Sequence, residues 1–268
     1  MKNLIFGSGV SAYKDFEGLR NVCRTAVMND ILKFDTAPSY KSEEILSKAL
    51  LEISKELGVS REKMYIQTKI DPIQMYDGRV VEYFKGKLKS MKLDYVDALL
   101  IHWPLKNYLE RTWNEMQEIK RLGLTRKIGI CNLRIDHLKS LEMNGLIPEI
   151  LQIERHPLNT FQSEVDFCHA KNIEVQDYSP LCKMHPLLKD NENLNAIAEK
   201  LGKNVGQIIL KWHIDTGATP IFTSKKNERI VQYSDIDDIN LEQDDIEAIA
   251  SLNMNHKLYL ESLVCPGF

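Results

Sequence analysis

The stretch ILKFDTAPSYKSEEILSKALLEISKELG, residues 31–58, joins a strand pattern to a helix pattern and indicates how the whole chain folds. The apolar run 31–35 ends in an acid, and a turn containing proline follows it. Within 42–57 the apolar side chains recur every three to four positions, which is typical of a helix with one buried face. Gly58 follows the last apolar residue, where helices commonly end. The stretch therefore predicts one strand–helix unit.

The same alternation of strand and helix patterns extends along the chain in both directions. We expect strands near residues 3–7, 31–35, 64–69, 95–102, 126–132, 149–154, 173–178 and 219–223. Helix patterns fill residues 42–57, 79–91, 109–122, 134–143, 161–171, 192–214 and 227–234, with an extra helix near 241–252. Such alternation favours a parallel sheet with crossover helices. Eight repeats in 268 residues predict an α/β fold, a single (β/α)8 TIM barrel with an extra C-terminal helix, in which residues 1–268 form one domain.

The bulk composition is that of an ordinary globular protein and excludes several classes of partner. Hydrophobic residues make up 43% and charged residues 27% of the chain, and the net charge is −3, so neither nucleic acid nor an anionic membrane surface is an expected partner. No apolar run is long enough for a membrane span, and the start reads as no signal peptide. Five scattered cysteines form no C-x-x-C pair, so we expect no metal site and a cytoplasmic location.

A glycine-rich segment at the first strand end leaves a second fold open. The sequence GSGVSA, residues 7–12, follows a strand pattern, and Asp35 ends the next one. This is close to a dinucleotide-binding fingerprint and makes an open Rossmann sheet the alternative to the barrel. In a barrel the same small residues would let the backbone pass close to a ligand.

Polar side chains stand at the ends of successive expected strands, and in a barrel these ends form the rim of the active site. Asp35, Lys69 and His102 end strands two, three and four, and Tyr40 lies in the turn after Asp35. Each of these residues alone has an ordinary structural interpretation. Together they form a set suited to acid–base chemistry.

The chemistry of that set points to an oxygen that gains negative charge. A free tyrosine has a pKa of about 10, and a nearby lysine ammonium lowers it by favouring the phenolate. An aspartate paired with Lys69 would keep the lysine charged and in place, and a histidine would orient the substrate oxygen. A carbonyl oxygen that receives a proton after hydride delivery fits this description.

At this point the sequence resembles a known family, the aldo-keto reductases, from about residue 5 to 234. The resemblance is carried by FDTAPSYKSEE, YIQTK, DALLIHWP, KIGICNL, LQIERHP, DYSPL and TSKKNERI, in that order. It implies a carbonyl reductase on a (β/α)8 barrel that acts on a small-molecule carbonyl substrate and uses NADPH, with NADH possible. It maps the catalytic residues onto Asp35, Tyr40, Lys69 and His102.

The resemblance also implies positions that hold the cofactor and the substrate. Asn132 and Gln152 would bind the nicotinamide carboxamide, and Tyr178 would stack under the ring. Ser224, Lys225 and Arg229 would surround the adenosine phosphate, and Trp103 would form an apolar wall of the substrate pocket. Further candidates for that pocket are Tyr13, Met184, His185 and the tail 253–268.

Several positions depart from the family pattern. Lys41 stands where glycine usually follows the tyrosine, and Cys131 stands where serine usually precedes Asn132. Thr223 replaces a lysine that often precedes the phosphate-site serine, so we expect only a moderate preference for NADPH. The N-terminal hairpin that usually plugs the barrel is missing or very short.

Two other functions remain open from the sequence. One is a non-catalytic NADPH-binding regulatory subunit on the same fold, although a mere binder needs no tuned phenol. The other is a glycosidase that would use Glu154 and a second carboxylate. The sequence names neither the carbonyl substrate nor the oligomeric state.

Overall fold

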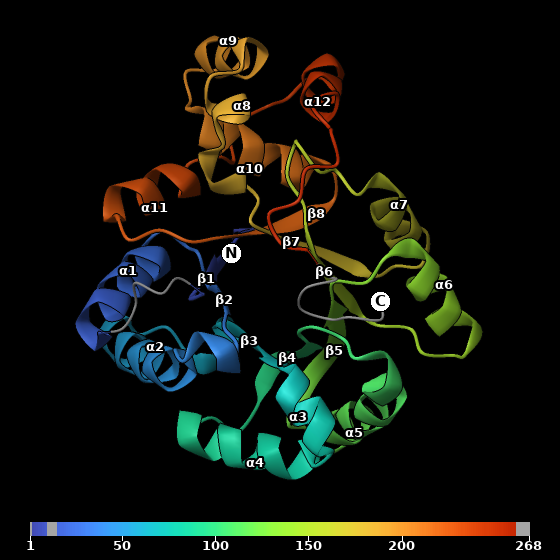
Figure 1. The fold of residues 1–268 in the computed structure, drawn as a ribbon. Helices are drawn as coiled ribbons and strands as arrows, with labels where there is room; N and C mark the ends of the chain where they lie inside the picture. Colours follow the sequence, from blue (N-terminus) through green and yellow to red (C-terminus); the bar gives the residue numbers. More distant parts are fainter. Residues whose placement is uncertain (1, 10–14, 261–268) are drawn as a thin grey trace.

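The computed structural model describes residues 2–9 and 15–260, and in this part of the chain eight strands close into a parallel barrel in sequence order, with β1 beside β8 (Figure 1). The strands are β1 Ile5–Gly7, β2 Lys33–Asp35, β3 Tyr65–Ile70, β4 Val96–Ile101, β5 Thr125–Cys131, β6 Ile150–Glu154, β7 Glu174–Tyr178 and β8 Ala218–Phe222. The predicted TIM barrel is confirmed, and the open Rossmann alternative is wrong because the first and last strands pair.

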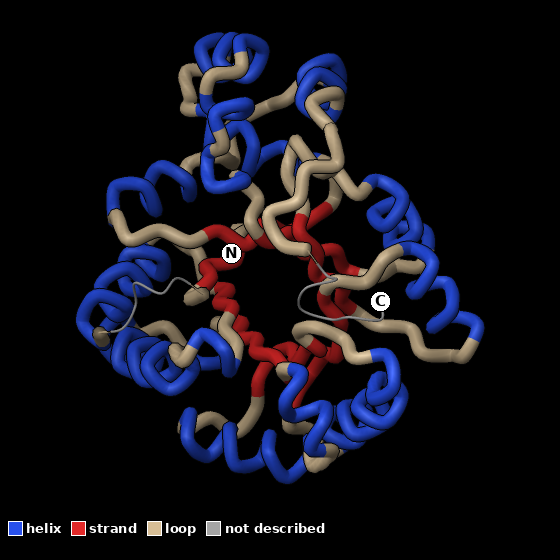
Figure 2. The backbone as a smooth tube through the Cα atoms, viewed as in Figure 1, coloured by secondary structure: helices blue, strands red, loops and turns tan. Residues whose placement is uncertain are grey.

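Helices surround the barrel on its outside, as Figure 2 shows. They are α1 Phe16–Met28, α2 Glu43–Leu57, α3 Pro72–Asp77, α4 Val80–Met91, α5 Leu109–Arg121, α6 Ile135–Met143, α7 Gln162–Ala170, α8 Pro186–Lys189, α9 Glu192–Lys200, α10 Val205–Asp215, α11 Asn227–Ser234 and α12 Gln243–Ala250. Short 3-10 turns are η1 Pro38–Tyr40, η2 Arg61–Lys63, η3 Lys106–Tyr108 and η4 Cys182–Met184. The extra C-terminal helix is α12. In the described residues, no helix has the length and apolar character needed to cross a membrane.

Two helix predictions differ from the structure. The pattern at 192–214 is two helices, α9 and α10, because Gly202 adopts a left-handed φ of 64° and Asn204 then caps a new helix by accepting the N–H of Gln207. Helix α1 was missed although Leu19, Val22 and Ala26 give it a buried stripe. The spacing of those residues carried the signal.

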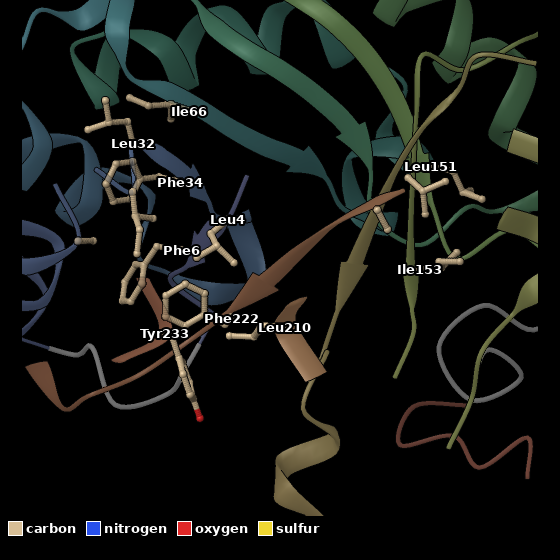
Figure 3. Packing of buried hydrophobic residues seen from close by; sticks show 14 of the residues in the cluster. Leu4, Phe6, Leu32, Phe34, Ile66, Leu151, Ile153, Leu210, Phe222 and Tyr233 are labelled. Atoms are coloured by element: carbon tan, nitrogen blue, oxygen red, sulfur yellow. The ribbon is translucent and has the colours of Figure 1, made fainter. Parts of the chain in front are cut away.

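Alternate residues along the strands face two different interiors. The larger cluster lies between the sheet and the helices and includes Phe6, Phe34 and Phe222, whose rings meet edge to face at 5.7–6.4 Å (Figure 3). A small second cluster, Ala98, Leu100, Cys131 and Ile150, lies apart from it. Since side chains alternate along a barrel strand, the other set of positions fills the barrel itself.

The barrel interior becomes polar toward the C-terminal ends of the strands. The amides of Gln67, Gln152 and Gln176 are buried and bonded to one another: Gln176 Oε1 accepts from the other two at 2.8 and 3.1 Å. Gln67 and Gln152 also donate to Asp35, at 2.7 and 3.3 Å. This amide layer is the floor on which the charged residues of the rim rest.

Candidate active site

A cavity of about 970 Å³ opens at the C-terminal ends of the strands. It lies at the upper end of the volumes typical of small-molecule sites. Its walls come from the ends of β1, β2 and β6–β8 and from the loops after them. Among its lining residues are Gly9, Asp35, Tyr40, His102, Trp103, Asn132, Gln152, Tyr178, Arg229 and Tyr259.

Asp35 and Lys69 form a fully buried ion pair at the base of the cavity. Lys69 Nζ donates to both carboxylate oxygens of Asp35 at 2.8 Å and to the carbonyl of Thr36 at 3.1 Å. Burial alone would lower the pKa of Lys69, but the charge of Asp35 outweighs it and raises that pKa above its ordinary value. The lysine is therefore an ammonium at neutral pH, held by neighbouring strands.

Tyr40 reaches this ion pair from η1. Pro38 begins that turn, and Lys41 ends it with a left-handed φ of 56°, a conformation that favours glycine. The phenol oxygen lies 3.5 Å from Lys69 Nζ and 3.5 Å from His102 Nε2. Burial raises the pKa of Tyr40 to about 12, although Lys69 lowers it in part. The expectation of a net lowered pKa is thus wrong for the protein alone, and Tyr40 is a neutral phenol that can donate a proton.

His102 follows β4 and lies between Tyr40 and a carboxylate that the sequence analysis did not select. Its Nδ1 is hydrogen-bonded to Asp71 Oδ1, and the other oxygen, Oδ2, accepts the backbone N–H of Ser39 at 2.7 Å. Asp71 is two residues beyond Lys69 and caps α3, with Gln74 completing the capping box. The sequence DPIQ, residues 71–74, carries the signal of a helix start, which would have placed Asp71 at the rim.

Asn132, Gln152 and Tyr178, the residues predicted to hold a nicotinamide, share one wall of the cavity. The Tyr178 hydroxyl donates to Asn132 Oδ1 at 2.8 Å, and Asn132 Nδ2 donates to the His102 carbonyl at 2.9 Å. Asn132 adopts a left-handed φ of 62°, which turns its side chain back over the strand ends. Gln152 uses Nε2 on Asp35 and Gln176, which leaves its Oε1 available to a donor in the cavity.

The segment between β8 and α11 brings cations to the other end of the cavity. Lys225 and Arg229 are exposed, and neither has an ion-pair partner among the residues the structure describes. Ser224 is buried, and its hydroxyl accepts the backbone N–H of Lys226 at 3.0 Å. Arg229 lines the cavity, whereas Ser224 and Lys225 do not. Asn227 was expected to cap the helix, but it is the first helical residue and Lys226 is the cap.

The outer wall of the cavity combines predicted and unpredicted residues. Trp103 lines it, with its ring 6.1 Å from that of His102. Met184 also lines it, but His185 instead caps α8, and Tyr13 lies outside the described residues. From the tail, Tyr259 lines the cavity with its ring 5.9 Å from that of Tyr178; residues 261–268 are not described.

Two alternative uses of single residues find no support in the geometry. Asp35 binds Lys69, and Gly7 and Gly9 line the cavity; a Cβ on Gly9 would lie 3.1 Å from the Tyr40 ring. The first glycines therefore give room to the site, while residues 10–14 are not described. Glu154 accepts the backbone N–H groups of Leu258 and Tyr259 at 2.6 and 3.0 Å, so its carboxylate holds the tail. Neither residue is placed as a glycosidase or a ribose ligand would be.

Comparison with known proteins places these features in a wider group. The sequence profile described as "Aldo/keto reductase family" matches residues 3–254. Glyoxal reductase of Bacillus subtilis is 35% identical over 94% of this chain and 90% of its own. Methylglyoxal reductase DkgA of Escherichia coli K12 is 35% identical over 84% of this chain and 80% of its own. The crystal structure of a Bombyx mori aldo-keto reductase in complex with NADP is 30% identical, with a TM-score of 0.88 over 98% of this chain and 92% of that one.

Proposed function

Because this chain belongs to the aldo/keto reductase family, we propose that it uses NADPH to reduce a small aldehyde or ketone to the alcohol, with Tyr40 as the proton donor. The observation that carries this proposal is the meeting of Asp35, Lys69, Tyr40 and His102 at one cavity. A protein that only bound the cofactor would need neither a buried ammonium beside a phenol nor a histidine facing that phenol. We also propose that the chain acts as one barrel domain.

The residues of the cavity fit an NADPH molecule in charge and in hydrogen-bonding capacity. Asn132 Nδ2 and Gln152 Oε1 offer a donor and an acceptor, as a carboxamide requires, and the Tyr178 ring gives a face for stacking. Ser224, Lys225 and Arg229 would hold the phosphate of the adenosine end, since Lys225 and Arg229 have no acidic partner among the described residues. When bound, the reduced nicotinamide would supply the hydride.

The protein residues act on the carbonyl oxygen. As negative charge develops there, the Tyr40 hydroxyl transfers its proton to that oxygen and becomes a phenolate. The Lys69 ammonium stabilises this phenolate from 3.5 Å, and Asp35 holds the ammonium in place. His102, on the opposite side of the phenol oxygen, positions the carbonyl. Trp103 closes the pocket on the side away from β2 and excludes water.

The relatives suggest where to begin the search for a substrate. Glyoxal and methylglyoxal are small dicarbonyl compounds, and we propose small oxoaldehydes as the first substrate class for this chain. A compact carbonyl would reach the space between Tyr40, His102 and Trp103 without displacing the tail residue Tyr259.

The test is the consumption of NADPH, followed at its absorbance band, with a panel of oxoaldehydes, simple aldehydes and ketones. Turnover of at least one carbonyl, with the matching alcohol identified as product, supports the proposal. Tight NADPH binding without turnover of any of them would favour the regulatory subunit instead. Repeating the panel with NADH measures the cofactor preference, which Thr223 is expected to weaken.

A further inference from the structure

The Asp71–His102 pair adds a carboxylate to the site that the proposed mechanism does not use. We propose that Asp71 is a positioning residue that fixes the proton of His102 on Nδ1, so that His102 can donate a hydrogen bond to the substrate only after taking up a second proton. This inference rests on the proposed function for its kinetic consequence. The tautomer itself is a property of the protein alone.

The first step of the argument is the charge state of Asp71. Its Oδ2 accepts the N–H of Ser39 at 2.7 Å, and its Oδ1 faces His102 Nδ1. Burial by itself raises the pKa of Asp71, but the bonds from His102 and Ser39 outweigh burial and lower it. An ionised carboxylate can only accept hydrogen bonds. The nitrogen that faces Oδ1 must therefore carry a proton.

The second step follows from the two nitrogens of one ring. In a neutral imidazole one nitrogen is a donor and the other an acceptor. With the proton on Nδ1, the lone pair lies on Nε2, the nitrogen that faces Tyr40 at 3.5 Å. The Tyr40 hydroxyl then donates to Nε2, and the proton that the reaction needs is directed at His102 and away from the substrate.

A second proton on His102 changes both relationships. Nε2 becomes a donor that can bind the carbonyl oxygen, and the Tyr40 hydroxyl is released to donate to the same oxygen. The groups that face the ring are Asp71 before α3, Lys69 on β3, Asp35 on β2 and Tyr40 on η1. Burial lowers the pKa of His102 and Lys69 lowers it further, while the two carboxylates raise it; the net direction is down. The doubly protonated form is therefore favoured only in mildly acidic solution.

The change that tests this is Asp71→Asn, which keeps the shape of the side chain and reverses its effect on the ring. Asparagine caps helices as well as aspartate does, so α3 should be preserved. The Ser39 N–H needs an acceptor, which directs the amide oxygen to it and turns the amide NH₂ toward Nδ1. The proton of His102 then moves to Nε2, where it can bind a carbonyl without a second proton. Asp77→Asn, at an exposed residue of the same helix, is the matched control.

Two measurements decide the matter. In ¹⁵N-histidine-labelled protein without cofactor, the signals of His102, assigned with a His102→Asn variant, should show a protonated Nδ1 in the wild type and in Asp77→Asn. In Asp71→Asn they should show a protonated Nε2. Finding the proton of wild-type His102 on Nε2 at neutral pH would overturn the inference, whatever the enzyme does.

The second measurement is kcat/KM for carbonyl reduction between about pH 5.5 and about pH 8. The wild type and Asp77→Asn should lose activity with rising pH, approaching about tenfold per pH unit. Asp71→Asn should be nearly flat over the same range. Parallel profiles for wild type and Asp71→Asn would contradict the inference while leaving the proposed function intact. A wild type that reduces no carbonyl would overturn the proposed function, and the ¹⁵N signals would then decide the tautomer alone.

Discussion

Replacing Lys69 by methionine removes the ammonium and keeps much of the length of the side chain. The buried Asp35 carboxylate would lose its cation and keep only the amides of Gln67 and Gln152 as partners. Removing one member of a buried ion pair typically destabilises a protein by about 3–5 kcal/mol. Changing Asp35 to Asn in the same protein removes the uncompensated charge, so we expect the double variant to recover most of that loss.

The effect of Lys69→Met on catalysis is separate from its effect on stability. At 3.5 Å and an effective dielectric of about 20, a cation stabilises a phenolate by about 5 kcal/mol. The opposite charge of Asp35, which raises the pKa of Tyr40, cancels part of this. With about 1.4 kcal/mol for each factor of ten, we expect kcat to fall by about 10²- to 10³-fold. The double variant should recover stability but not this rate.

The assays are urea unfolding for stability and NADPH consumption for kcat, with Lys69→Met, the double variant and the exposed-site control Lys89→Met. Without Lys69 the pKa of Tyr40 rises further above its value of about 12. Tyr40 is then protonated in both proteins between about pH 7.5 and about pH 9, so the ratio of their rates should be constant there. A double variant that regained activity together with stability would show that Lys69 matters only for folding, and would refute the reasoning.

Two further variants test the cofactor end and the turn. Arg229→Ala should weaken NADPH binding by about 10- to 150-fold, the equivalent of about 1.5–3 kcal/mol for a charge-assisted contact, and barely change NADH binding, as measured by quenching of intrinsic fluorescence. Equal weakening of both cofactors would mean that Arg229 does not contact the extra phosphate. Lys41→Gly should relieve about 1–2 kcal/mol of left-handed strain, against about 0.5–1 kcal/mol for the freedom of glycine in the unfolded chain, so thermal unfolding should shift upward slightly at unchanged kcat. A lower melting temperature would contradict this.

Much of the fold could be predicted because its signals are local. Strand patterns that end in Asp35 and His102 are short apolar runs, and the helix that ends at Gly58 shows its buried stripe in the sequence. Parallel strands in one barrel place their C-terminal ends at one rim. That rule was enough to bring Asp35, Lys69 and His102 together with Tyr40 before any coordinates were considered.

The parts that could not be predicted depend on depth and direction. Asp71 follows Lys69 by two residues, but only the start of α3 turns its carboxylate toward His102. The pKa of Tyr40 depends on how completely the phenol is buried, and burial outweighs the neighbouring ammonium that the sequence suggested would dominate. Tyr259 reaches the cavity because Glu154 holds the tail, a contact between residues more than a hundred positions apart.

The most direct test of the central claim is the rate of carbonyl reduction by Tyr40→Phe, measured together with its affinity for NADPH. The change removes one hydroxyl and leaves the aromatic ring, Lys69 and the cofactor wall in place. If Tyr40 is the proton donor, kcat/KM for the best carbonyl substrate should fall by at least about 10²- to 10⁴-fold while the Kd for NADPH stays close to that of the wild type. A Tyr40→Phe protein that reduced the same substrate at near wild-type rate would contradict the account.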